Sequence, residues 1–203
     1  MHHDTEAIRA ILDKEAEAIR NIPVNGEFDR AVQLMYERVH RGGGKIISSG
    51  MGKAGHVANH IATTLSSTGS PALFIHPSEA QHGDLGIIRQ NDLLLLLSNS
   101  GRTREIIELV ALTRALHASI PVILITGNPE GELVNKSEVV LFTGHPDEVC
   151  PLGLTPTTSS TAMAVIGDVL VVLLMKKIRF TPEDYARRHH GGYLGQKSRG
   201  TAV

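Results

Sequence analysis

The sequence predicts an α/β fold: a doubly wound, five-stranded parallel sheet with helices on both faces, preceded by two N-terminal helices. Short apolar segments alternate with longer segments of helical spacing, as expected for a parallel sheet built from strand–helix units. One apolar segment, "DLLLLLS" at 92–98, is continuous and does not alternate with polar residues. Continuous apolar strands are typical of parallel sheets, because their strands are buried on both faces.

The elements can be assigned in order along the chain. The expected strands are the β-branched end of 42–50, then 71–76, 92–98, 121–128 and 137–144. The expected helices are 4–21, 27–41, 53–69, 103–118 and 156–178, with a short helix and a Gly-rich tail in 181–200. Residues 77–91 contain Pro77, Gly83 and Gly86, so we expect this segment to be irregular.

Length and composition limit the domain organisation and the partners. The 203 residues are 41% hydrophobic and contain no repeat or low-complexity linker, so one domain over 1–203 is expected. A net charge of −1, 3% aromatic residues and no Trp argue against a nucleic-acid partner. The single cysteine, Cys150, indicates a reducing compartment. The longest apolar run, 162–175, carries Asp168 and is too short for a membrane span. We therefore expect a buried core helix there, no membrane association, and a cytoplasmic protein.

Two polar loops are expected at the carboxyl edge of the sheet, where ligands bind in such folds. They are "SSGMGKAGH" at 48–56 and "SNSGRTRE" at 98–105, and each leads into a helix N-terminus, which favours an anion. Ser98, Ser100 and Thr103 add hydroxyl donors without charge, which suits a phosphate monoester. A capped turn is the alternative for "SNSG" alone, and the spacing of "GMGKAGH" excludes a Walker A loop.

Several titratable residues are candidates for chemistry. Glu105 opens a helix, and Glu148 lies in a loop punctuated by Pro and Gly, which makes it the better general-base candidate. His189 and His190 precede "GGYLG" on a tail that could close over a site, or they form an exposed dipeptide. Lys53 follows the first loop. His56 and His60 are one helical turn apart, but no third ligand follows, so no metal is expected to be required.

Five motifs occur in the order "GMGKAGH", "HPSEAQHGDLG", "SNSGRTRE", "EVCPLGLTPTTSSTAMAVIGDVL" and "HHGGYLG". In this order they resemble the sugar isomerase (SIS) domain of the D-arabinose 5-phosphate isomerases, over roughly residues 4–200. The phosphate loop is common to the wider superfamily, whereas "HGDLG" with "CPLGLTPTTS" is more specific to this group. The resemblance implies a flavodoxin-like arrangement of the predicted sheet.

The resemblance also implies roles for individual residues. The residues matching substrate- or phosphate-binding positions are Ser49, Gly50, Gly52, His82, Ser98, Asn99, Ser100 and Thr103. Those matching catalytic positions are Lys53, Glu105, Glu148 and His189. His82 matches a histidine that can contact an inhibitory zinc ion. Members are typically tetramers in which the tail histidine reaches a neighbouring subunit's site, so a homotetramer with shared sites is expected.

The implied reaction interconverts D-arabinose 5-phosphate and D-ribulose 5-phosphate through a cis-enediol, supplying the Kdo branch of lipopolysaccharide synthesis. It requires a sugar phosphate and no cofactor. Our assignment makes Glu148 the base at C2, with a pKa raised towards neutrality by partial burial. Lys53 stabilises charge on oxygen. His189 serves ring opening and proton transfer between oxygens, while Glu105 orders the first loop through Lys53.

Three departures from the family pattern stand out. "RHHGG" replaces the usual "SHPGG", so the histidine assignment is shared between His189 and His190. Arg102 and Arg104 occupy positions that are often acidic or neutral. Most members continue into a pair of cystathionine-β-synthase-type modules, and this sequence ends at Val203, so regulation by such modules is not expected.

Two other functions stay open at this stage. A non-catalytic phosphosugar sensor would use the same loops but would not need the acids and the tail histidine together. An isomerase of another sugar phosphate, such as sedoheptulose 7-phosphate or hexulose 6-phosphate, would share the fold. The "HGDLG" and "CPLGLTPTTS" blocks weigh against that second alternative.

Overall fold

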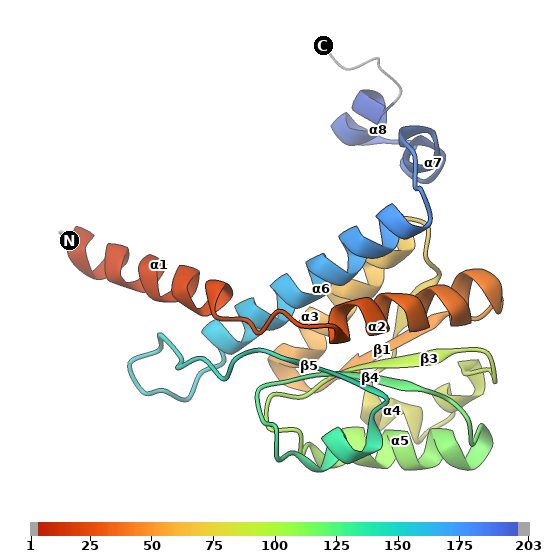
Figure 1. The fold of residues 1–203 in the computed structure, drawn as a ribbon, viewed down its shortest axis with the longest axis horizontal. Helices are drawn as coiled ribbons and strands as arrows, with labels where there is room; N and C mark the ends of the chain where they lie inside the picture. Colours follow the sequence, from red (N-terminus) through yellow and green to blue (C-terminus); the bar gives the residue numbers. More distant parts are fainter. Residues whose placement is uncertain (1–3, 199–203) are drawn as a thin grey trace.

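The computed structural model describes residues 4–198 and contains the predicted five-stranded parallel sheet (Figure 1). The strand order is β2-β1-β3-β4-β5, and all four pairings are parallel. The strands are β1 (Ile46–Gly50), β2 (Ala72–Phe74), β3 (Leu93–Leu97), β4 (Val122–Thr126) and β5 (Val139–Phe142). The expected fold class is confirmed, and the chain reverses its direction of winding between β1 and β3.

Helices cover both faces of the sheet (Figure 1). Leu93, Leu95 and Leu97 pack into the core beneath α2 (Glu27–Met35), α3 (Gly52–Ser67) and α6 (Thr158–Lys177). The alternate side chains, Leu94 and Leu96, pack on the other face against α5 (Arg104–Leu116). The five leucines are therefore fully buried because each face of β3 has its own hydrophobic core.

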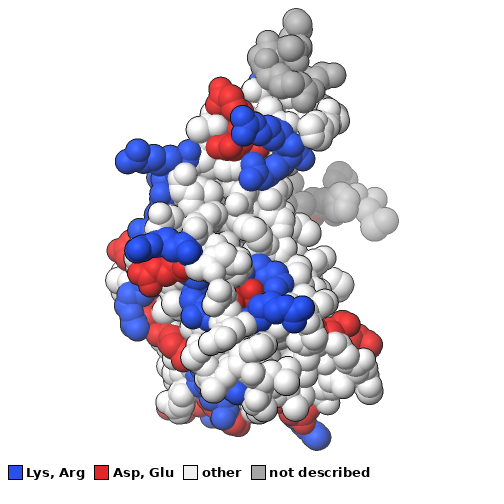
Figure 2. Space-filling model, turned by 90° about the vertical axis from the view of Figure 1, so that its right-hand side faces the viewer, with Lys and Arg blue, Asp and Glu red and all other residues white. Residues whose placement is uncertain are grey.

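The remaining helices lie at the ends of this core. The N-terminal helix α1 (Thr5–Arg20) extends away from the sheet past the start of α6, and α7 (Pro182–Arg188) and α8 (Gly192–Ser198) follow the far end of α6 (Figure 1). Asp4 caps α1 by accepting from the amides of Glu6 and Ala7. Acidic and basic side chains are interspersed over the face seen in Figure 2, so that face carries no single-sign surface.

The helix α6 is long and apolar enough to cross a membrane by length and composition, with a mean hydropathy of 1.8. It packs instead against α3 and the sheet, and half of that apolar window is buried within the described structure. Ala162, Ile166 and Leu170 are fully buried on its inner face. The expected core helix is therefore present at this position.

Three expectations about local structure were wrong. Residues 77–91 are not irregular throughout: they contain α4 (Pro77–Ala80), begun by a proline at its first position, and the 3-10 turn η2 (Asp84–Ile87). The predicted helix 27–41 changes after Met35 to a π-helical segment, η1 (Tyr36–Arg41). The Gly-rich tail forms α8, because Gly195 has no Cβ and can pack on the His189 carbonyl. A further 3-10 segment, η3 (Glu132–Lys136), was not foreseen.

Candidate active site

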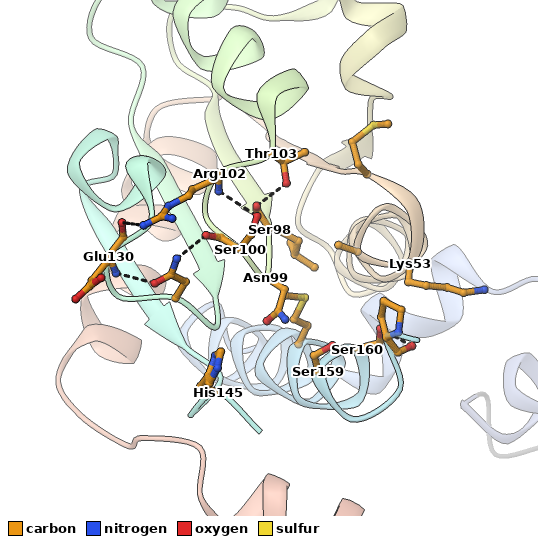
Figure 3. A pocket seen from close by; sticks show the side chains of 16 residues that line it. Lys53, Ser98, Asn99, Ser100, Arg102, Thr103, Glu130, His145, Ser159 and Ser160 are labelled. Atoms are coloured by element: carbon orange, nitrogen blue, oxygen red, sulfur yellow. Dashed lines mark hydrogen bonds between the residues drawn. The ribbon is translucent and has the colours of Figure 1, made fainter. Parts of the chain in front are cut away.

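A pocket of about 670 Å³ opens at the carboxyl edge of the sheet (Figure 3). Its walls are the start of α3, the β3–α5 loop, the β4–η3 loop and the N-terminal part of α6 with the loop before it. Its polar lining consists of Lys53, Ser98, Asn99, Ser100, Arg102, Thr103, Asn128, Glu130, His145, Ser159 and Ser160. Four predicted phosphate-binding residues and the predicted lysine are thus brought together.

The β3–α5 loop presents its hydroxyl groups at the start of α5. Ser98 is only 2% exposed, and its Oγ lies 2.8 Å from Thr103 Oγ1. Thr103 occupies the N-cap of α5, yet its side chain makes no capping hydrogen bond to the helix. The first amides of α5 therefore have no side-chain acceptor of this kind, and together with the helix dipole they favour an anion.

The β4–η3 loop holds the β3–α5 loop in place. Gly101 has a φ of +61°, and a Cβ on Gly131 would lie 2.6 Å from the Gly101 Cα, so the two backbones touch. Asn128 Nδ2 donates to the Ser100 carbonyl at 2.9 Å. Because glycine alone allows this approach, the two loops form one wall of the pocket.

The β1–α3 loop meets the expectations only in part. The Ser49 hydroxyl is fully buried and donates to the Ile75 carbonyl at 2.8 Å, so the side chain does not line the pocket. Gly50 and Gly55 lie in direct backbone contact, where a Cβ on Gly55 would be 2.6 Å from the Gly50 oxygen. Gly50 thus joins strand to helix, and Gly52 makes the turn with a φ of +56°. In Figure 3 the Lys53 side chain runs away from Ser98 and Ser100.

Glu148 lies at the N-terminus of α6, beside the pocket. Its Oε2 accepts from the Thr157 amide at 2.7 Å and the Thr157 hydroxyl at 2.9 Å, and its Oε1 accepts from the Ser159 hydroxyl. Burial acts to raise the pKa of Glu148, but the hydrogen bonds from Ser159 and Thr157 outweigh it and lower the pKa below its ordinary value. The expectation of a raised pKa was therefore wrong. Glu148 borders the pocket through Ser159.

Three other predicted residues lie outside the pocket lining. Glu105 is half-buried in the first turn of α5, and His82 is exposed in the turn between α4 and η2. His189 ends α7, where its ring stacks on Tyr185 at 3.7 Å. The 20 residues of α6 span about 30 Å and separate His189 from the pocket end of that helix. Within one chain His189 is therefore remote from the pocket.

Sequence reasoning missed several lining residues, of which His145 is the most unusual. Its φ is +53°, a left-handed conformation that is uncommon for residues other than glycine. Its Nδ1 lies 3.1 Å from the Gly127 carbonyl, an arrangement in which Nδ1 donates to the carbonyl oxygen. The preceding Gly144, also left-handed, was the available signal in the sequence.

Cys150 occupies the exposed loop between Glu148 and α6. The Thr155 hydroxyl, followed by the backbone amides of Thr155, Leu154 and Leu152, donates to its sulfur and lowers the pKa of the thiol to about 6. The thiolate therefore predominates at neutral pH.

Comparison with known proteins agrees with this arrangement. The SIS domain model matches residues 41–173. The chain belongs to the SIS domain family. It is 43% identical to the arabinose 5-phosphate isomerase KdsD of Yersinia pestis over 95% of this chain and 57% of that protein. It is 45% identical to KdsD of Pseudomonas aeruginosa, over 86% of this chain and 52% of that protein. This SIS chain thus spans just over half the length of these curated relatives.

Two solved structures resemble the whole SIS chain. One, from Bacteroides fragilis, is described as a phosphosugar isomerase involved in capsule formation; it is 58% identical, with a TM-score of 0.93, and the match covers 94% of this chain and 100% of that one. The other, from Escherichia coli CFT073, was solved in complex with arabinose 5-phosphate; it is 29% identical, with a TM-score of 0.84, over 92% of this chain and 99% of that one.

Proposed function

We propose that this chain is an arabinose 5-phosphate isomerase that interconverts D-arabinose 5-phosphate and D-ribulose 5-phosphate. The observation that carries the proposal is the hydroxyl-lined pocket at the N-terminus of α5, with Ser98 and Thr103 paired at 2.8 Å. The KdsD names of relatives at 41–45% identity and the arabinose 5-phosphate complex of a structural neighbour support the substrate. This chain matches just over half of the length of those relatives, so their activity is a proposal for this chain.

The phosphate is proposed to bind at the β3–α5 loop. Ser98, Ser100 and Thr103 offer hydroxyl donors, Asn99 an amide, and α5 its first backbone amides. Ser49, Gly50 and Gly52 contribute by shaping the turn that carries Lys53. Binding the phosphate there anchors the sugar remotely from its reacting carbons, so that binding energy is available for orientation at C1 and C2.

Proton transfer at C2 is proposed for Glu148. Its lowered pKa keeps the carboxylate ionised at neutral pH, ready to accept a proton, and Ser159 connects it to the pocket. The C2 proton is taken, a cis-enediol forms, and a proton returns to C1. Lys53 supplies positive charge for the developing oxyanion, and Glu105 is proposed to order the first loop through Lys53. No cofactor takes part in these steps.

The tail histidine is proposed to act on a neighbouring subunit. The length of α6 keeps His189 from the pocket of its own chain, which supports a homotetramer with shared sites. There His189, or the adjacent His190, would serve ring opening and proton transfer between O1 and O2, and His82 would lie near the same shared site. We further propose a supply role for Kdo and lipopolysaccharide, which the KdsD names suggest, and a cytoplasmic location.

The test is to incubate the purified protein with arabinose 5-phosphate and measure ketose formation. The proposal predicts conversion to ribulose 5-phosphate, in both directions, without added metal or nucleotide. Binding of the phosphosugar without conversion would instead indicate a sensor. Conversion of a hexose or heptose phosphate in preference to the pentose would replace the substrate.

A further inference from the structure

Arg102 is an exposed, charged residue that lines the pocket, and its side chain contacts a neutral partner. Its Nη2 donates to the Glu130 carbonyl at 3.3 Å, and its backbone amide donates to Ser100 Oγ at 3.2 Å (Figure 3). In the part of the chain that the structure describes, no carboxylate forms an ion pair with it. A carbonyl partner orients the guanidinium without neutralising it, so the full positive charge is left for a ligand.

The loop backbone beside Arg102 is held in place. The neighbouring Gly101 lies against Gly131 in backbone contact, and Asn128 holds the Ser100 carbonyl at 2.9 Å. The guanidinium therefore extends from a wall made of two packed loops. A guanidinium carries five N–H donors in a planar fork that matches phosphate oxygens, and most of them are left after the single bond to Glu130.

Arg104, two residues further, is placed quite differently. Its side chain is 87% exposed and pairs with Glu108 at 2.7 Å on α5, and it does not line the pocket. The hydrogen bond that Arg104 donates to Glu108 raises the pKa of Arg104, as expected for a satisfied ion pair. The two arginines thus have the same charge and nearly the same place in the sequence, but only Arg102 faces the pocket.

We propose that Arg102 is a binding residue for the phosphate of the substrate, adding a cation to the hydroxyl cradle of Ser98, Ser100 and Thr103. This inference rests on the proposed phosphosugar function. Lys53 runs away from the β3–α5 loop, and Arg102 is the cation of that loop that lines the pocket. A guanidinium favours the dianion of a phosphomonoester over an uncharged sugar, so Arg102 also sets specificity for phosphorylated ligands.

The experiment compares Arg102→Ser with Arg104→Ser, which removes the same charge two residues further, at the first residue of α5. The dissociation constant of inorganic phosphate and the KM and kcat for arabinose 5-phosphate are measured for each. Arg102→Ser should weaken phosphate binding and raise KM by about 10- to 100-fold, with kcat reduced far less. Arg104→Ser should stay within about twofold of the wild type.

Two further readouts separate binding from loop damage. Arg102→Lys keeps the charge but loses the planar fork, so it should recover part of the lost affinity. Raising the salt concentration should weaken phosphate binding by the wild type more than by Arg102→Ser, because the lost contact is charged. The urea midpoint of Arg102→Ser could instead fall, while Arg102→Lys binds phosphate no better than Arg102→Ser. That result would show that Arg102 only supports the loop, and it would overturn the inference.

The inference and the proposed function fail in different ways. Equal effects of Arg102→Ser and Arg104→Ser on phosphate binding, or no phosphate binding by the wild type, would overturn the role of Arg102. A wild-type protein that binds phosphate through Arg102 but converts no arabinose 5-phosphate would overturn the isomerase function and leave the phosphate site standing.

Discussion

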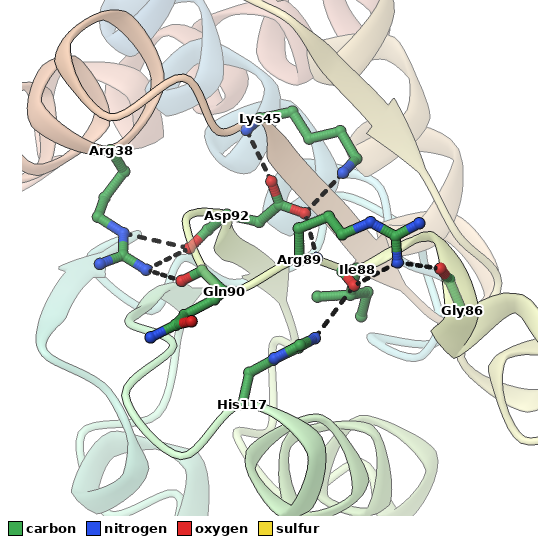
Figure 4. A network of polar contacts seen from close by, with 8 residues as sticks. All are labelled: Arg38, Lys45, Gly86, Ile88, Arg89, Gln90, Asp92 and His117. Atoms are coloured by element: carbon green, nitrogen blue, oxygen red, sulfur yellow. Dashed lines mark hydrogen bonds and ion pairs between the residues drawn. The ribbon is translucent and has the colours of Figure 1, made fainter.

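The two edges of the sheet use charged and polar residues in opposite ways. At the amino edge Asp92 is 1% exposed and accepts from the Lys45 amide at 2.9 Å, Lys45 Nζ at 2.7 Å and the Arg89 amide at 2.8 Å (Figure 4). Arg38 donates to the Asp92 and Gln90 carbonyls. At the carboxyl edge the hydroxyls of Ser98 and Thr103 form a hydrogen bond with each other, and the Arg102 side chain donates to the Glu130 carbonyl.

The difference shows where the fold uses its polar groups for structure and where it leaves them for a ligand. The Asp92 cluster joins η1, the start of β1 and the turn before β3, and the carboxylate has three protein donors. The polar groups at the carboxyl edge are oriented by the loops, but their hydrogen-bonding capacity is not filled by protein partners. Changes at the amino edge should therefore alter stability, and changes at the carboxyl edge should alter binding or turnover.

Glu148 should give the largest effect, on turnover. Glu148→Gln keeps the size of the side chain but removes its basicity, so turnover should fall by about 10²- to 10⁴-fold while phosphosugar binding persists. Exchange of the C2 proton with deuterated solvent should be lost as well. Glu105→Gln is the matched control: if it abolishes exchange and Glu148→Gln does not, the two roles are reversed.

The same carboxylate should give a defined pH dependence of stability. The hydrogen bonds from Ser159 and Thr157 hold its pKa below the unfolded value of 4.5. A lowered folded pKa means that the stabilisation is fully present above about pH 4.5 and is lost as the pH falls through the folded pKa. Glu148→Gln should therefore flatten the loss of stability that the wild type shows on acidification. Urea denaturation at a series of pH values from neutral to well below the unfolded pKa would detect the difference.

Asp92 should give the largest effect on stability. Asp92→Ala leaves Lys45 Nζ and two backbone amides without their acceptor, so the free energy of unfolding should fall by about 3–5 kcal/mol. Urea denaturation measures this change. The folded fraction should still bind phosphate with wild-type affinity, because the cluster lies at the opposite edge. Weaker phosphate binding by folded Asp92→Ala protein would contradict the assignment of the amino edge to stability alone.

Ser100 should show the reverse pattern, with a smaller effect. Its side chain is exposed, and losing a hydrogen bond to a charged phosphate costs about 1.5–3 kcal/mol, so Ser100→Ala should weaken phosphosugar binding by about tenfold or more. Its free energy of unfolding should be nearly unchanged. Calorimetric titration together with urea denaturation makes the comparison, and unaltered affinity would remove Ser100 from the cradle.

Cys150 should give the smallest effect on fold or binding, but a clear chemical one. Donors led by the Thr155 hydroxyl lower the thiol pKa to about 6, so its alkylation by iodoacetamide should increase around that pH and level off above it. Mass spectrometry of labelled protein gives the profile. Thr155→Val should move the rise to higher pH; a profile centred near the ordinary thiol value in the wild type would contradict the loop geometry.

The sequence predicted those features that depend on pattern or on position along a strand. The leucines of β3 located the core, and the polar residues after them located one wall of the pocket. Features that depend on how loops fold could not be predicted: the left-handed His145 and the hydrogen bonds that lower the pKa of Glu148. The arginine at 102 was visible in the sequence, but only the structure shows that it lines the pocket and contacts the Glu130 carbonyl.

The most direct test of the carboxyl-edge pocket as an isomerase site is the conversion of arabinose 5-phosphate in deuterated water. An enediol route with Glu148 as base predicts ribulose 5-phosphate that carries solvent deuterium at C1, detected by NMR. The Glu148→Gln variant should form little or none of this deuterated product. Failure to form ribulose 5-phosphate, or undiminished formation of the product by Glu148→Gln, would contradict the account.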